Sequence, residues 1–389
     1  MKWKNRGREL EALGEKLRIH TWKKIYIYGA GMIGEEVYDK IRFLDIPIEF
    51  ADGSPQKQKE GFKGVSVVSP KKIFHEGSVI VVAASKYNTE TIIKNIACNS
   101  CGEYREGVNV FTASSFLALP LHLYSSYIEK KLYFEDITIL VTEKCTLKCR
   151  DCAPCYPYLK NARHRSFEEV KADIDLLFSK ADYIWDLIFT GGEPFLNKEF
   201  GKMLEYVMEH YASRYHHMQI ISNATVIPSD GICEMLKGTG GGYISISDYT
   251  CVNDRLKNKL SQFTEKMDAY GIRYEIPQVD SWCDFGFRAK EHPPKSREEL
   301  IDMFDACRST CRAFHEGKFI FCVPAMYAAR AVYEEQPVDT DCCFESGDKN
   351  EIMEWNLGYS EKGYLDMCAK CYGYITINQH KVEAGVQIQ

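Results

Sequence analysis

The 389-residue sequence has no long apolar run and no block of basic residues, and each absence narrows what the protein can be. No apolar stretch approaches the roughly 18 residues that a membrane-spanning helix needs. Residues 1–20 are charged and lack the apolar core of a secretory signal. The net charge is −6 and Lys and Arg are not clustered, so an electrostatic footprint for nucleic acid is missing. We therefore expect a cytoplasmic protein without membrane or nucleic-acid partners.

Cysteine, by contrast, is abundant, with 16 residues in the chain. In a protein without an export signal, cysteines are kept reduced, so these are expected to be metal ligands or free thiols rather than disulfides. The length and a hydrophobic content of 45% are enough for two or three domains with their own cores.

Three of these cysteines form a C-x3-C-x2-C loop directly after a strand-like apolar run at residues 137–141: Cys145, Cys149 and Cys152. Iron–sulfur clusters ordinarily take four cysteine ligands, so three thiolates leave one iron of a four-iron cluster open to another ligand. Cys155 offers a second register with Cys149 and Cys152, but only the first register has this spacing. A structural zinc site is the alternative.

A second motif follows the strand-like run at residues 187–190, namely Gly191-Gly192-Glu193-Pro194. A residue without Cβ lets the backbone approach a ligand closely, and a carboxylate accepts a charge-assisted hydrogen bond from an ammonium group. The two motifs, in this order, resemble the signatures of the radical S-adenosylmethionine (radical SAM) superfamily. The resemblance covers about residues 137–250. It implies that SAM chelates the open iron and that Gly191 to Pro194 face its amino group.

Two later strand ends extend the resemblance. Ser222 and Asn223 are candidates for contacts to the SAM ribose, and Ser245 and Ser247 share one face of the next strand. The alternative for these polar residues is a cap close to a turn. The chain departs from the family at Asp151, where an aromatic residue usually precedes the third cysteine. The resemblance also implies an oxygen-sensitive, anaerobic enzyme that takes electrons from a reductant such as flavodoxin or ferredoxin.

Residues 135–303 alternate strand and helix patterns, which predicts an α/β fold with a partial (β/α)6 barrel of about six strands as the radical SAM core. The predicted helix over residues 166–180 opens with a capping box of Ser166 and Glu169. Both motifs fall at the C-terminal ends of predicted strands, where the sites of such barrels lie.

Residues 1–113 predict a Rossmann-like domain of nucleotide-binding type. Gly29, Gly31 and Gly34 follow a predicted strand and open a helix, and Asp52 ends the next strand. A nucleotide site and a purely structural turn are both consistent with this pattern. Residues 114–134 read as a linker to the barrel.

Residues 304–389 contain the second concentration of cysteines. The segment from Cys311 to Cys322 predicts a hairpin with Glu316-Gly317 at its turn, which brings Cys311 opposite Cys322. A C-x2-C turn adds Cys368 and Cys371. Four such thiolates suit one auxiliary 4Fe–4S cluster, and the pattern resembles the twitch domain, a short relative of the SPASM domain.

One of the four ligands of the auxiliary site is not fixed by the sequence. Cys307 competes with Cys311 as the ligand that comes first in the chain, and a zinc ribbon is the structural alternative. Cys98 and Cys101 also have C-x2-C spacing but lack a partner pair in their domain.

By resemblance, the reaction is reductive cleavage of SAM to a 5′-deoxyadenosyl radical that removes hydrogen from a substrate. The single auxiliary cluster, as electron acceptor, and the Rossmann-like module favour oxidation or epimerisation of a sugar, aminocyclitol or nucleotide-linked sugar. Radical modification of a peptide or protein is the second hypothesis. A non-catalytic iron–sulfur carrier or zinc protein is the third, and the Gly191–Pro194 motif argues against it. No catalytic acid or base can be assigned.

Overall fold

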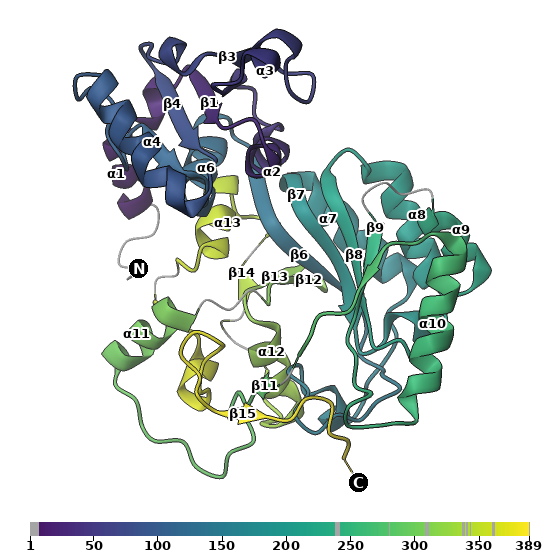
Figure 1. Ribbon diagram of the computed structural model, residues 1–389. Helices are drawn as coiled ribbons and strands as arrows, with labels where there is room; N and C mark the ends of the chain where they lie inside the picture. The colour runs from purple at the N-terminus through teal and green to yellow at the C-terminus, as the bar shows by residue number, and fades with distance from the viewer. Residues whose placement is uncertain are drawn as a thin grey trace. The chain divides into compact units, whose positions relative to one another are not determined.

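The computed structural model describes residues 8–237, 242–279, 281–307, 311–336, 339, 341–342, 344–359 and 362–388. Contacts between Cα atoms divide the chain into two compact units, with the break between Tyr133 and Phe134 (Figure 1). These are called the N-terminal unit and the C-terminal unit below.

The N-terminal unit is built on a five-stranded parallel sheet with the strand order β3-β2-β1-β4-β5. This order is that of a Rossmann-like half, with β1 and β4 on either side of the point where the chain changes direction across the sheet. The expected fold is therefore confirmed. The elements are α1 (Arg8–Lys16), η1 (Ile19–Thr21), β1 (Lys24–Tyr28), α2 (Met32–Ile41), β2 (Ile48–Ala51), α3 (Pro55–Glu60), β3 (Val67–Val68), η2 (Pro70–Lys72), β4 (Ser78–Val82), α4 (Lys86–Asn99) and β5 (Val110–Thr112).

The segment that the sequence suggests as a linker, residues 114–134, is largely helical, and up to Tyr133 it belongs to the N-terminal unit. It contains α5 (Ala113–Ala118), α6 (Pro120–Leu123) and the π-helix η3 (Tyr124–Ile128). Trp22 stacks on Phe116 and on Tyr124, with ring centroids 6.0 and 5.2 Å apart. The structure differs from the expectation because these large apolar side chains are buried within the N-terminal unit. In a solvated linker they would be exposed to water, which is unfavourable.

The C-terminal unit contains an eight-stranded sheet with the order β10-β9-β8-β7-β6-β12-β13-β14. Strands β7 to β10 pair in parallel, and β12 pairs in parallel with β6. This confirms an α/β core built on a parallel sheet. Its elements up to the end of the parallel strands are β6 (Leu132–Thr142), η4 (Tyr156–Tyr158), α7 (Phe167–Lys180), β7 (Ala181–Gly191), η5 (Pro194–Leu196), α8 (Phe200–Tyr211), β8 (Tyr215–Ser222), α9 (Asp230–Lys237), β9 (Gly242–Ile246), α10 (Leu256–Tyr270) and β10 (Tyr274–Glu275).

The rest of the unit continues the same sheet. Its elements are β11 (Trp282–Cys283), α11 (Arg297–Cys307), β12 (Ala313–His315), β13 (Lys318–Ile320), α12 (Val323–Ala331), β14 (Asp341–Cys342), α13 (Lys349–Asn356), η6 (Asp366–Lys370) and β15 (Lys381–Val382). The domain boundary expected between residues 303 and 304 falls inside α11. Because Ala313 and Phe314 pair with Thr138 and Ile139 of β6, the cysteine-rich region is joined to the barrel sheet and forms one compact unit with it.

Alternate residues of the parallel strands face different environments, as the two-residue period of a strand requires. Phe189, Met218, Ile220 and Ile244 are fully buried, and helices α8, α9 and α10 lie along one side of this sheet (Figure 1). Residues on the other face are partly exposed and mix polar side chains, described below, with Ile188 and Ile221.

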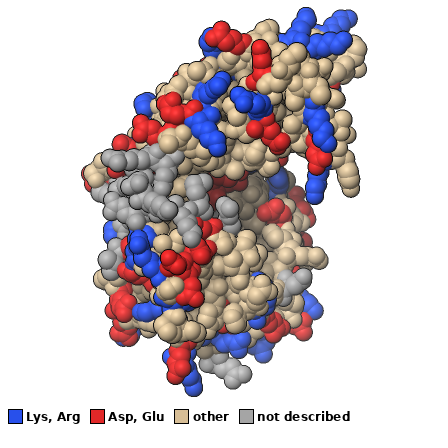
Figure 2. Space-filling model, turned by 90° about the vertical axis from the view of Figure 1, so that its left-hand side faces the viewer, with Lys and Arg blue, Asp and Glu red and all other residues tan. Residues whose placement is uncertain are grey.

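None of the helices in the described part of the chain is long and apolar enough to span a bilayer. On the face drawn in Figure 2, acidic and basic side chains are interspersed over the described surface.

Candidate functional site

The loop that follows β6 brings the three predicted thiols together. Cys145 and Cys152 are partly buried and Cys149 is buried, and a turn closes from the Cys152 amide to the Cys149 carbonyl at 3.3 Å. Burial raises the pKa of Cys145 to about 11 and that of Cys152 to about 12, and neighbouring thiolates of the loop add to both shifts. The three thiols therefore lie within electrostatic reach of one another on one loop, where a positively charged metal would favour their ionised form.

Gly191 and Gly192 are required by the way the cysteine loop packs on them. The Gly192 and Glu193 amides donate to the carbonyls of Thr142 and Lys144, both at 2.9 Å. A Cβ on Gly191 would overlap the Thr142 carbonyl, and one on Gly192 would overlap the Lys144 carbonyl. The Gly-Gly-Glu-Pro turn thus pairs edge to edge with the start of the loop, and only glycine fits at these two positions.

The Glu193 carboxylate has several hydrogen-bond donors within the protein. Its side chain is fully buried. It accepts hydrogen bonds from the Ser222 hydroxyl at 3.0 and 3.1 Å, the Asn223 amide at 2.9 Å and the Phe195 amide at 3.2 Å. Burial raises the pKa of Glu193 to about 7, although these donors oppose the shift. The carboxylate therefore ties the turn to the end of β8, and its contact to the SAM amino group stays a prediction.

The end of β8 is also tied to the cysteine loop. Asn223 donates from its side-chain amide to the Cys145 sulfur and to the Thr146 hydroxyl, both at 3.3 Å. Its own oxygen accepts from the Thr225 amide at 3.0 Å. Ser222 is buried against Glu193, and its contact to the SAM ribose stays a prediction. Of this expected pair, Asn223 is the one that lies at the thiols.

The next strand end contributes a residue that the sequence reasoning missed. Ser245 is buried on β9, and the Ser247 amide donates to the Ser222 carbonyl at 2.8 Å. Two residues on is Tyr249, whose pKa is raised by burial and further by the charges of Cys149, Cys152 and Cys145, so its phenol lies within electrostatic reach of the loop thiols. The signal that could have found it is an aromatic residue directly after the Ser-x-Ser-Asp strand end.

Asp151, the departure from the family pattern, is held by ion pairs. Its carboxylate pairs with Arg150 at 2.9 Å and with Arg288, which also donates to the Tyr158 hydroxyl at 2.7 Å. Cys155, the alternative loop ligand, is buried in an apolar cluster that also contacts Cys322. Cys155 therefore faces the C-terminal part of the unit.

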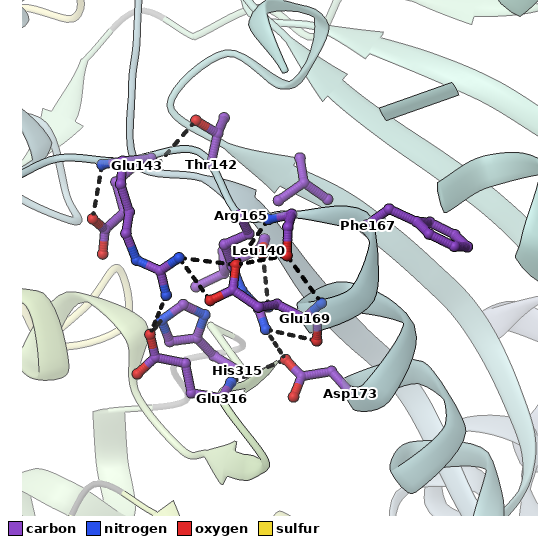
Figure 3. A network of polar contacts seen from close by, with 12 residues as sticks. Leu140, Thr142, Glu143, Arg165, Phe167, Glu169, Asp173, His315 and Glu316 are labelled. Atoms are coloured by element: carbon purple, nitrogen blue, oxygen red, sulfur yellow. Dashed lines mark hydrogen bonds and ion pairs between the residues drawn. The ribbon is translucent and has the colours of Figure 1, made fainter. Parts of the chain in front are cut away.

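A polar network that is buried at Glu143 and exposed at Arg163 and Glu316 supports the first residue of the loop, Glu143 (Figure 3). Glu143 accepts from the Arg163 amide at 3.3 Å and pairs with Arg330 of α12 at 3.0 Å. The Arg163 guanidinium bridges Glu169 of α7 at 2.7 and 2.9 Å and Glu316 at 3.0 Å. The start of the cysteine loop is thus linked to α7 and to the turn between β12 and β13.

The same network holds the β12–β13 turn (Figure 3). Asp173 pairs with Arg165 at 2.7 Å and accepts the amides of Glu316 and Gly317 at 2.9 and 2.7 Å. His315 is buried beside it. Burial and the nearby Arg165 charge lower the pKa of His315 to about 3, so its imidazole is neutral. No sequence motif marks these contacts, because their members come from three separate segments.

The hairpin expected in the C-terminal region is present with the expected register. His315 pairs with Lys318 and Ala313 with Ile320, and Glu316 and Gly317 have φ values of 52° and 75°, as a two-residue turn requires. Counting outward from these pairs brings Cys311 opposite Cys322, and the Val323 amide donates to the Cys311 carbonyl at 3.1 Å.

The other C-terminal thiols lie around this pair. Burial raises the pKa of Cys322 well above its ordinary value, and Cys311, Cys371 and Cys368 add to the shift. Burial also raises the pKa of Cys368 and of Cys371 to about 12, with Cys307 among the further causes. All five predicted thiols therefore lie near one another, and Cys307 and Cys311 both stay candidates for the fourth ligand.

No three His, Cys, Asp or Glu side chains among the described residues converge on a point suited to a single metal ion. The cluster and zinc hypotheses for the two cysteine groups both stay predictions.

In the N-terminal unit, two of the three predicted glycines are explained by packing. A Cβ on Gly29, whose φ is +117°, would overlap the Ala83 carbonyl, and one on Gly34 would overlap the Gly29 carbonyl, whereas Gly31 has open space. Asp52 accepts the Ala30 and Ser54 amides at 3.0 and 2.9 Å and pairs with Lys57 at 3.2 Å. Burial opposes its ionisation, but these partners outweigh it and lower the pKa of Asp52. The acid is thus engaged with the glycine turn itself. Cys98 and Cys101 of this unit are exposed.

Comparison with known proteins gives a match to the Radical SAM superfamily over residues 139–259. The chain is 30% identical over 129 residues to Fe-coproporphyrin III synthase of Methanosarcina barkeri (strain Fusaro / DSM 804). That match covers 33% of this chain and only 30% of the relative.

Two solved structures have a related arrangement at low similarity. One is native anSMEcpe with bound AdoMet, with a TM-score of 0.40 and 13% identity over 60% of this chain and 84% of the other. The other is BtrN in complex with AdoMet and 2-DOIA, with a TM-score of 0.36 and 16% identity over 66% and 98%.

Proposed function

We propose that this protein is a radical SAM enzyme in which Cys145, Cys149 and Cys152 hold a four-iron cluster with one iron left for SAM. The observation that carries the proposal is the joint geometry of the loop and the Gly-Gly-Glu-Pro turn. The three thiols lie on one loop, with Cys149 buried and Cys145 and Cys152 partly buried, and the turn is hydrogen-bonded to the start of that loop. A non-catalytic electron carrier has no need of that turn.

When bound, the cluster would supply the electron that splits SAM into methionine and a 5′-deoxyadenosyl radical. The chain's own residues hold the geometry for this chemistry. Glu193 anchors the turn to β8, Asn223 donates to the Cys145 sulfur, and Tyr249, which follows β9, lies within electrostatic reach of the loop thiols. A reductant such as flavodoxin or ferredoxin would deliver the electron.

The C-terminal thiols support an auxiliary 4Fe–4S cluster of twitch type. The hairpin supplies Cys311 and Cys322, the turn at η6 supplies Cys368 and Cys371, and Cys307 lies within electrostatic reach of the latter pair. We propose residues 135–303 as the functional radical SAM core and residues 304–389 as the auxiliary-cluster region of the same compact unit.

We propose a sugar, aminocyclitol or nucleotide-linked sugar as substrate. The support is the face of the barrel sheet opposite the buried apolar residues. There Asp186 pairs with His217 at 3.0 Å, and Gln219 and Tyr243 are neighbours in register on the adjoining strands. All four are partly exposed. A polar inner face of this kind suits a ligand with many hydroxyl groups, since each needs a hydrogen-bond partner. In the N-terminal unit, the open space at Gly31 is the position that fits a phosphate group.

The test is anaerobic incubation of reconstituted protein with SAM and a reductant, followed by chromatography of the products. We expect 5′-deoxyadenosine and methionine, and more of both when the correct sugar is present. A deuterated substrate should transfer its label to the 5′-deoxyadenosine. Protein with full iron and sulfide content that leaves SAM intact would contradict the proposal.

A further inference from the structure

The segment of residues 385–388 lies against the cysteine loop as an added strand. Gln387 forms an antiparallel bridge with Cys149. The Arg150 amide donates to the Val386 carbonyl at 2.7 Å, and the Ile388 amide donates to the Lys148 carbonyl at 2.8 Å. A segment more than 200 residues further along the chain thus pairs with the backbone on both sides of the middle cysteine.

The Gln387 side chain reaches the sulfur of that cysteine. Its amide oxygen accepts the Lys148 amide at 2.6 Å, while its nitrogen donates to the Cys149 sulfur at 3.2 Å and to the Gly385 carbonyl at 2.6 Å. The orientation of the amide is determined, because a flipped amide would set its NH2 group against the Lys148 N–H and its oxygen against the Gly385 carbonyl. Its donor therefore has to face the sulfur.

The segment is held in this register by aromatic contacts. Gly385 has φ +76°, and a Cβ there would meet the Tyr249 ring at 2.7 Å. Tyr249 packs edge to face on Trp282, with centroids 5.5 Å apart, and Trp282 pairs with Val382 of β15. The segment is therefore fixed at one end by β15 and along its length by the cysteine loop and Tyr249.

We propose that Gln387 is a positioning residue that raises the reduction potential of the cluster held by Cys145, Cys149 and Cys152. The proposal rests on the function proposed above. Hydrogen bonds to the ligand sulfurs are among the factors that set the potential of an iron–sulfur cluster. Reduction adds negative charge that spreads onto the thiolates, so a donor at a thiolate stabilises the reduced form more than the oxidised form. Gln387 supplies such a donor to Cys149 from a distant part of the chain.

Two variants and one control test this in the full-length reconstituted protein. Gln387→Leu removes the donor without adding charge. Gln387→Glu keeps the oxygen that accepts from Lys148 and replaces the donor by a second oxygen facing the sulfur. Ile388→Glu, the control, adds the same charge one residue along, where alternation points it to the other face of the segment.

The measurement is an anaerobic redox titration followed by electron paramagnetic resonance, using the signal that changes when SAM is added. Removing the donor in Gln387→Leu should make reduction about tenfold less favourable, which is about 59 mV for one electron. Gln387→Glu should lower the potential further, and Ile388→Glu should lower it much less. Iron content should stay unchanged in all three variants.

Unchanged reduction potentials in both Gln387 variants would overturn the proposal. An equal fall of the potential in Ile388→Glu and Gln387→Glu would also overturn it, because the added negative charge alone would then explain the fall. If Gln387→Leu did not bind the cluster, the test would rest on the reduction potential of Gln387→Glu, which keeps the contact to Lys148, compared with that of Ile388→Glu. A failure of the proposed function looks different, because then no signal would respond to SAM in the wild-type protein, and both claims would fall.

Discussion

The cysteine loop after β6 and the C-terminal cysteines differ in how their members are brought together. Cys145, Cys149 and Cys152 lie within one loop, so their spacing alone predicts that they meet. Cys307, Cys311, Cys322, Cys368 and Cys371 come from a helix end, a hairpin and a separate turn, and they meet only because the hairpin extends the barrel sheet. The first group is a local motif, whereas the thiols of the second group come together only when the tertiary structure has formed.

The comparison also separates two kinds of support. Hydrogen bonds from the Gly-Gly-Glu-Pro turn and from Asn223 hold the loop. A hydrogen bond from the Gly317 amide to the charged Asp173 carboxylate and an ion pair between Arg163 and Glu316 hold the hairpin turn. The loop should therefore be sensitive to backbone substitutions, and the hairpin to changes in charge.

The largest expected effect is the loss of the loop cluster. Cys145→Ala removes one of three ligands, so SAM cleavage should fall to background, while Cys155→Ala should keep it because Cys155 faces the C-terminal apolar cluster. Product analysis by chromatography and iron counting check this. Retained cleavage in Cys145→Ala, or its loss in Cys155→Ala, would favour the second register.

The C-terminal group should behave independently of the loop. The double variant Cys368→Ser/Cys371→Ser should lose about half of the iron, because one of two four-iron clusters is gone, yet it should still cleave SAM slowly without substrate. Single variants Cys307→Ser and Cys311→Ser then sharpen the assignment. Only the true ligand should lower the iron content, and equal retention in both would contradict a four-thiolate site.

An intermediate effect is expected from the turn that holds the loop. Gly192→Ala places a methyl group on the Lys144 carbonyl and should destabilise the protein by about 1–3 kcal/mol, as overpacking does. Gly231→Ala, at a glycine with nothing within 4 Å, is the matched control. Denaturant unfolding monitored by circular dichroism compares them. Equal stability of the two variants would show that the loop does not depend on close backbone packing.

The smallest effect concerns the hairpin and pH. The folded state holds His315 with a pKa of about 3, below the ordinary 6.5, so the unfolded state binds more protons between these values and stability falls as the pH falls through this window. Between pH 8 and pH 6 the expected loss is about 0.8 kcal/mol. His315→Leu should remove this part of the pH dependence in urea titrations. A variant with the same slope as the wild type would refute the neutral buried imidazole.

Local patterns predicted much of this molecule. The capping box of Ser166 and Glu169 opens α7 as expected, the strand order of the N-terminal unit follows from its βαβ pattern, and the hairpin register was counted from one Glu-Gly turn. In each case the partners lie close in sequence or repeat with a fixed period.

What the sequence did not predict are contacts between distant residues. The burial of Glu193 against Ser222, the position of Tyr249 within electrostatic reach of the thiols, and the bond from Gln387 to Cys149 all depend on which strand ends meet. The helical segment at 114–134 was read as a linker because its pattern is short and mixed, and only its packing on Trp22 shows its place.

The most direct test of the account is the response of the loop cluster to SAM. Reduced, anaerobically reconstituted protein should show an electron paramagnetic resonance signal that changes shape when SAM is added and is missing in Cys145→Ala. A signal unaffected by SAM, or a loop that binds zinc in place of iron, would contradict the claim that one iron there is left for the cofactor.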